Sequence, residues 1–89
     1  MRCVISVLGK DRTGIVAAVS TALANHGVGI DDINQSILQD MFSMTMLVSI
    51  DEEKATFNEV QDALAKVADE LGVQIVIQRE DLFQFMYKI

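Results

Sequence analysis

The sequence predicts a single α+β domain in which two helices cover one face of a four-stranded antiparallel sheet. Apolar residues tend to alternate in four segments, which indicates strands, and recur every three or four residues in two others, which indicates helices. These segments follow one another in the order strand, helix, strand, strand, helix, strand. The chain has 89 residues, the size of one domain, and contains no proline and no linker-like stretch that would mark a boundary.

The first half of the chain supplies one strand, one helix and two further strands. Residues 2–8 are rich in Val and Ile and predict a largely buried strand. Residues 15–26 carry apolar side chains at helical spacing, and the glycine that follows is a common helix stop. The more polar segment 29–38 predicts a second strand. After a short turn, residues 42–50 show the clearest alternation in the chain and predict a third strand.

The second half begins with a strong helix signal. Thr56 and Glu59 match the T-x-x-E capping box, in which each side chain accepts a hydrogen bond from an otherwise unpaired N–H. Apolar residues then recur at helical spacing until Gly72, and residues 73–78 alternate as a fourth strand. This order is the split β-α-β arrangement of ferredoxin-like folds, a βαββαβ sandwich. Right-handed crossovers place both helices on the same face of the sheet.

The C-terminal residues predict a short additional helix that docks on the rest of the domain. One helical face of the tail would present Leu82, Phe85, Met86 and Ile89. A nine-residue helix is unstable in isolation, so it must pack against other residues. We therefore expect one domain over residues 1–89, with a core over 1–79 and a C-terminal docking helix over 81–89.

Composition narrows the function classes. Hydrophobic residues make up 51% of the chain, which is rich for so small a domain and predicts a homodimer or higher homo-oligomer. The net charge of -6 argues against direct binding of nucleic acid, which needs clustered Lys and Arg. No apolar run approaches the ~18 residues of a membrane span. The single cysteine, Cys3, cannot form an internal disulfide, which favours a cytoplasmic location.

The polar turn between the first strand and the first helix is the best candidate for a functional site. It has the sequence Gly-Lys-Asp-Arg-Thr-Gly over residues 9–14 and leads directly into a helix. Backbone N–H groups and the helix dipole meet at such a turn, which can hold a small anion such as a carboxylate. Equally, it can be a tight turn that only starts the helix. It is not a phosphate-binding P-loop, because Ile15 and Val16 replace the Lys and Ser or Thr that contact phosphate and magnesium.

Other polar residues have weaker claims. Asp31 and Asp32 could meet a ligand's ammonium group near the same turn, or could be a solvated strand start. A metal site there has only two adjacent carboxylates to offer. His26 lies in the last helical turn, where a cation is favoured by the dipole. Cys3 and His26 have no recognisable catalytic or zinc spacing, so we expect no metal, no cofactor and no catalytic residue.

The element order together with the D-R-T-G-I turn resembles the ACT domain. That family typically carries D-R-x-G-[IL] at this turn, often with proline at x, and a helix ending in Gly before an L/V-N-I strand start. The matching residues here are Asp11, Arg12, Gly14, Ile15, Gly27, Val28 and Ile30. Thr13 replaces the common proline and supplies a hydroxyl that could cap the helix. Gly29 replaces the usual Asn.

The whole chain, including its tail, is similar to small stand-alone bacterial and archaeal ACT proteins of uncharacterised function. The pattern is also similar to the amino-acid-sensing repressors of the glycine cleavage system, which carry two such domains. The resemblance implies a non-catalytic regulatory module, because ACT domains bind amino acids or other small ligands at dimer interfaces. They do so with the first strand–helix loop and the start of the second strand.

Carried onto this chain, the resemblance implies a ligand site built on that turn. The backbone N–H groups of Gly14, Ile15 and Val16 would hold a carboxylate. Asp11 or Asp31 would offset an ammonium group, and Asn34 could add a polar contact. The candidate ligand-binding residues are therefore Asp11, Thr13, Gly14, Ile15, Val16, Asp31 and Asn34.

Two other functions stay open. One is a protein–protein assembly module with no small ligand. The other is a small ferredoxin-like enzyme, although no nucleophile is paired with a base in this sequence.

Overall fold

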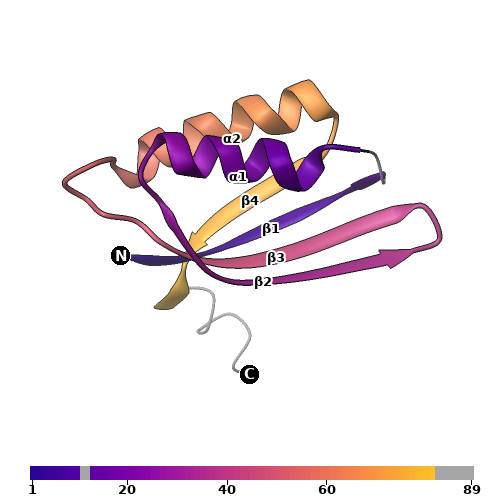
Figure 1. Ribbon diagram of the computed structural model, residues 1–89, viewed down its shortest axis with the longest axis horizontal. Helices are drawn as coiled ribbons and strands as arrows, with labels where there is room; N and C mark the ends of the chain where they lie inside the picture. The colour runs from indigo at the N-terminus through magenta and orange to yellow at the C-terminus, as the bar shows by residue number, and fades with distance from the viewer. Residues whose placement is uncertain (11–12, 82–89) are drawn as a thin grey trace.

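The structure is a computed structural model that describes residues 1–10 and 13–81. Its elements are β1 (Arg2–Lys10), α1 (Ile15–Asn25), β2 (Gly29–Leu38), β3 (Met41–Ser49), α2 (Phe57–Leu71) and β4 (Gln74–Arg79) (Figure 1). The predicted βαββαβ order is therefore confirmed. The C-terminal docking helix expected over 81–89 lies, apart from Asp81, outside the described residues.

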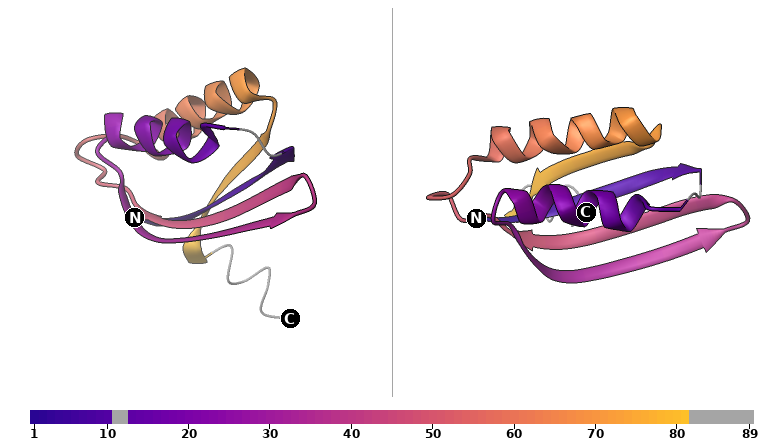
Figure 2. Two further views of the ribbon diagram at one scale, coloured as in Figure 1. Left: turned by 45° about the vertical axis from the view of Figure 1, so that its right-hand side comes forward. Right: turned by 45° about the horizontal axis from the view of Figure 1, so that its top comes forward.

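The four strands form one antiparallel sheet in the order β2-β3-β1-β4. Both helices lie on the same face of this sheet, as predicted, and Figure 2 shows this helix layer from two further directions. The strands β1 and β3 occupy the centre, while β2 and β4 form the two edges. The face opposite the helices is called the open face below.

The core lies between the sheet and the helices. Every second residue of β3 is buried, which confirms the alternation read from the sequence. The side chains exposed by less than 2% are Cys3, Ile5, Val7, Ile15, Val19, Leu23, Met44, Met46, Val48, Val60 and Leu64. They come from the two central strands and from one face of each helix. The ends of β1 and α1 that flank the candidate turn are thereby fixed to the core.

The helix α2 begins and ends at the residues that its sequence predicts. The Thr56 hydroxyl accepts a hydrogen bond from the Glu59 N–H at 3.2 Å, and the Glu59 carboxylate accepts one from the Thr56 N–H at 2.9 Å. The hydrogen bond from the Thr56 backbone, followed by that from its side chain, lowers the pKa of the Glu59 carboxyl. At the other end Gly72 adopts a left-handed conformation with φ of 70°.

The edge strand β2 is exposed along its whole length. It contains a bulge between Ile30 and Asp32. Ile33 and Ile37 share a sheet face with Met46 and Phe42, which are buried, yet they are themselves 37% and 57% exposed. Apolar side chains therefore continue beyond the described helix layer to the outer edge of the sheet.

Candidate functional site

The turn before α1 presents the uncapped N-terminus of a helix. Gly14 is the N-cap residue and has φ of 93°, a left-handed conformation that favours glycine. The first helical hydrogen bond runs from the Ala18 N–H to the Gly14 carbonyl at 2.9 Å. No side chain among the described residues caps this helix. Within residues 1–10 and 13–81, no side chain therefore occupies the N–H groups of this first turn, and the helix dipole makes this end electropositive.

The burial of the described turn residues indicates whether the backbone or the side chain of each could contact a ligand. Thr13 and Gly14 are exposed. Thr13 is not the N-cap residue, and the cap that its hydroxyl could supply is not seen. The side chain of Ile15 is 2% exposed and that of Val16 packs partly on the core. Only the backbone of Ile15 can therefore face a ligand, while its side chain anchors the turn. Asp11 lies outside the described residues.

The space above the turn is open. A Cβ atom added at Gly14 would meet no atom of the described residues within 4 Å, its two chain neighbours aside. Described residues line three shallow cavities of about 520 to 650 Å³, and none of these three includes Gly14. The described residues thus leave the first-turn N–H groups open to a small molecule and do not enclose it.

The structure separates Asp31 from this turn. Along β1, Arg2 pairs with Ser49 at one end and Lys10 with Met41 at the other. The start of β2 also pairs with Ser49, so Asp31 lies at the Arg2 end of the sheet. The two ends, Arg2 and Lys10, are eight residue steps apart, about 26 Å at 3.3 Å per residue. Within one chain, Asp31 cannot contact a ligand held at Gly14.

The order of the elements along the chain already predicts that Asp31 lies far from the turn. A crossover helix returns the chain to the end of the sheet from which it came, so β1 and β2 run in the same direction. The start of β2 must then lie near the start of β1, and away from the turn that follows β1. Of the two interpretations of Asp31 and Asp32, this return excludes a contact with the turn within one chain and agrees with a solvated strand start.

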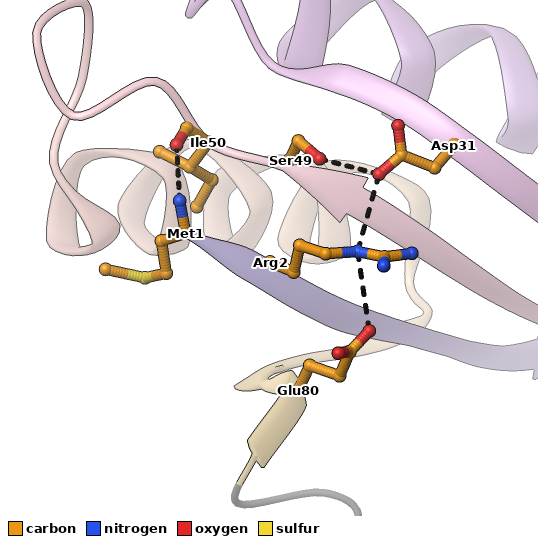
Figure 3. A network of polar contacts seen from close by, with 6 residues as sticks. All are labelled: Met1, Arg2, Asp31, Ser49, Ile50 and Glu80. Carbon is orange, nitrogen blue, oxygen red and sulfur yellow. Dashed lines mark hydrogen bonds and ion pairs between the residues drawn. The ribbon is translucent and has the colours of Figure 1, made fainter.

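Asp31 instead belongs to a polar network at the other end of the sheet, shown in Figure 3. Its carboxylate accepts a hydrogen bond from the Ser49 hydroxyl at 2.6 Å and lies 3.8 Å from the Arg2 guanidinium. Arg2 also lies 3.5 Å from the Glu80 carboxylate. The Arg2 side chain is 52% exposed, so these ion pairs contribute no more than about 1 kcal/mol each. The network connects both edges of the sheet, and its long-range pairs have no local sequence signature.

The remaining polar candidates are dispersed. Asn34 lies in the middle of β2 opposite Thr45 and is exposed. The Asp32 carboxylate accepts a hydrogen bond from the Ile33 N–H at 2.9 Å, a local contact that accords with a solvated strand start. At the end of α1, a ring nitrogen of His26 lies 2.9 Å from the Ala22 carbonyl oxygen.

Other site chemistries find little support in the described part of the chain. Residues 1–10 and 13–81 contain no group of three or more His, Cys, Asp or Glu placed to hold a metal ion. Burial raises the pKa of the Cys3 thiol, which makes it less reactive. Among the same residues, no helix is both long and apolar enough to cross a membrane.

Comparison with known proteins places these features in context. Residues 2–78 match the model of a family described as ACT domain. The UPF0237 protein of Methanocaldococcus jannaschii is 47% identical over 88 residues, covering 99% of this chain and 98% of that protein. The ACT domain protein from Streptococcus pneumoniae is 39% identical, with a TM-score of 0.80 and 94% of each chain covered.

The resemblance to glycine cleavage repressors holds for the fold. The structure of a putative glycine cleavage system transcriptional repressor superposes with a TM-score of 0.77, covering 86% of this chain and 44% of that one. The two sequences are 22% identical, so this likeness concerns the fold alone.

Proposed function

Because this chain belongs to the ACT domain family, we propose that it is a non-catalytic regulatory module that binds an amino acid or a similar small carboxylate at a homodimer interface. ACT domains are in general regulatory modules that bind small ligands. The observation that carries the proposal is the open, uncapped N-terminus of α1 at Gly14. We place the protein in the cytoplasm and, given its net charge of -6, expect no direct contact with nucleic acid.

The carboxylate of the ligand is held, in this proposal, by the N–H groups of Gly14, Ile15 and Val16. These groups lack partners within the helix because they belong to its first turn. Charge-assisted hydrogen bonds to a carboxylate are stronger than neutral ones, and the helix dipole adds to them. The exposed Thr13 lies beside this position and could contact the ligand's remaining polar groups.

The ammonium group of the ligand is offset by Asp31 of the partner subunit. Two copies of β2 paired antiparallel about a two-fold axis would place the start of one strand beside the end of the other. That end of β2 lies on the side of the sheet that carries the Gly14 turn. The pairing thus unites the two halves of the site that one chain keeps apart. Asn34, near the middle of β2, would lie close to the two-fold axis and contact the same residue of the partner subunit.

Several properties of β2 support this pairing. All of its ten residues are exposed, and none of the described strands pairs with its outer edge. An exposed strand edge is a ready template for pairing with another chain. Ile30, Ile33 and Ile37 offer apolar surface next to that edge, with exposed fractions of 42%, 37% and 57%. A ligand that contacts both subunits would favour the dimer by its differential affinity.

Thermal unfolding in the presence of each amino acid tests the proposal. A ligand at 100 times its Kd stabilises the folded state by about 2.7 kcal/mol, so its Tm shift is measurable. Gly14→Val should abolish the shift, because the new side chain occupies the space in front of the N–H groups. Gly72→Val is the matched control, since Gly72 also has a left-handed backbone and open space around its Cβ. An equal ligand response in both variants would place the site elsewhere.

A protein–protein assembly module without a small ligand is the second candidate. The exposed apolar residues along β2 favour it, because they suit a protein partner as well as a second copy. In that case no amino acid at millimolar concentration would change Tm. A stable complex with a defined partner would also survive Gly14→Val.

A further inference from the structure

The open face of the sheet carries aliphatic side chains among polar ones. On the side of β2 and β3, the polar residues Asn34, Ser43 and Thr45 share this face with Leu38 and Leu47. On the side of β1 and β4 they include Val4, Leu8 and Val76. Leu8 is 45% exposed and Val76 is 52% exposed. The β1 and β4 side is called the aliphatic half below, after Val4, Leu8 and Val76, although Ser6, Gln74 and Gln78 lie on it too. Its exposed apolar surface is small and matches one short segment better than a whole domain.

The chain leaves the sheet beside this aliphatic half. After β4, residues Glu80 and Asp81 begin a helical turn on the side of the sheet away from α1 and α2 (Figures 1 and 2). Two ion pairs accompany this turn: Arg2 with Glu80 at 3.5 Å and Arg79 with Asp81 at 3.1 Å. Acidic side chains at the start of a helix are favoured by its dipole. The eight residues that follow Asp81 therefore start on the open face, next to β1 and β4.

The length and pattern of those eight residues match the aliphatic half. A helix over residues 80–89 would be about 15 Å long at 1.5 Å per residue. The distance along β1 from Val4 to Leu8 is about 13 Å. Because Val4 pairs with Gln78, the helix would start at the Val4 end and reach Leu8. At helical spacing its apolar face consists of Leu82, Phe85, Met86 and Ile89.

We propose that the C-terminal segment 82–89 continues the turn at Glu80 and Asp81 as an amphipathic helix and packs on the aliphatic half of the open face of its own chain. A second copy is the less suitable occupant of this surface. Three aliphatic side chains, one of them only 7% exposed, fall far short of the about 800 Å² per partner that a stable interface buries. This proposal is independent of ligand binding and leaves β2 free for the dimer.

Chemical labelling of a cysteine on the covered surface tests the proposal. Val76→Cys in the full chain should react with a water-soluble maleimide roughly tenfold more slowly than the same variant ending at Asp81, as for any site protected by a docked segment. Thr21→Cys, exposed on α1 in the helix layer, is the control and should react equally in both lengths. The native Cys3 is fully buried and contributes little background. Equal labelling of Val76→Cys in both lengths would overturn the proposal.

A disulfide experiment shows whether the segment that docks belongs to the same chain or to a second copy. It uses only the full-length protein, so it does not depend on whether the shortened chain folds. The full-length variant carrying Val76→Cys and Phe85→Cys is oxidised under mild conditions. Docking within one chain gives a species of monomer mass with an internal disulfide. Disulfide-linked dimers in place of that species would overturn the proposal in favour of exchange between copies, and no disulfide at either position would overturn it outright.

Discussion

Substitution of Gly9 tests how the candidate turn is positioned. Gly9 lies within β1, and a Cβ atom added there would approach Val73 Cγ1 to 2.6 Å, Val73 Cβ to 2.9 Å and Val73 Cα to 3.2 Å. Two of these atoms lie at or next to the backbone, so the neighbouring chain must move. Overpacking of this kind costs about 1–3 kcal/mol. For a domain of this size, Gly9→Ala should therefore lower Tm by at least about 4 °C.

A double-mutant cycle with Val73→Ala identifies the cause. Val73→Ala alone loses two buried methyl groups and costs about 1–2 kcal/mol. In the double variant the nearest clashing atom, Val73 Cγ1, is gone, while the Cβ at 2.9 Å stays. The rescue is therefore partial, and the double variant should be more stable than the sum of the single effects by at least about 0.5 kcal/mol.

The assay for this cycle is urea unfolding followed by far-ultraviolet circular dichroism, since the chain has no tryptophan. Protein concentration is held constant because dimerisation would contribute to stability. Gly29→Ala is the control: its Cβ would meet nothing within 4 Å, and its stability should change by less than about 0.5 kcal/mol. Equal stability of Gly9→Ala and Gly29→Ala, or purely additive effects at positions 9 and 73, would show that the close approach to Val73 does not determine which residue position 9 accepts.

Three further predictions concern α2 and its N-cap. Thr56→Ala removes the hydroxyl that accepts from the Glu59 N–H and should lower stability by about 1 kcal/mol in the same urea assay; an unchanged midpoint would show that the cap is unimportant. The pKa of Glu59 is lowered in the folded protein, so its stabilising effect is present above its ordinary pKa of 4.5 and is lost as pH falls through the folded value. Glu59→Gln keeps a capping side chain but cannot ionise, so stability measured from pH 7 down to 3 should fall less steeply than in the wild type. Leu64→Ala, at a side chain only 1% exposed, should cost about 2–5 kcal/mol and unfold the domain well below the wild-type Tm, as calorimetry can measure.

Local signals in the sequence predicted most of the fold. The capping box at Thr56, the stop at Gly72 and the alternation along β3 all depend on residues close in the chain, and all appear in the structure. The sequence pattern predicts that Gly9 belongs to the turn, yet Gly9 lies in β1, where Val73 leaves no room for a side chain. That close approach joins residues far apart in the sequence, so no local pattern could reveal it.

The candidate site was less predictable than the fold. The glycine-bounded turn was found because its left-handed Gly14 and its helix start are local features. Asp31 was assigned to the same place from its nearness in element order, while strand register places it at the opposite end of the sheet. A second chain could bring its Asp31 to a ligand at the Gly14 turn only through a dimer interface. In the sequence of one chain, the sign of such an interface is limited to apolar residues along an exposed strand edge.

The strand order also has a consequence for how the chain reaches its fold. The first strand made, β1, pairs on one side with β3 and on the other with β4, so Cys3 must meet Arg79 near the far end of the chain. By contrast, the hairpin of β2 and β3 closes locally. Until β4 is available, one edge of the Val- and Ile-rich β1 stays without a partner strand. Such non-local pairing slows folding and exposes apolar strands to aggregation. Substitutions in β1 should accordingly alter folding yield in cells more than their effect on the stability of the finished domain would suggest.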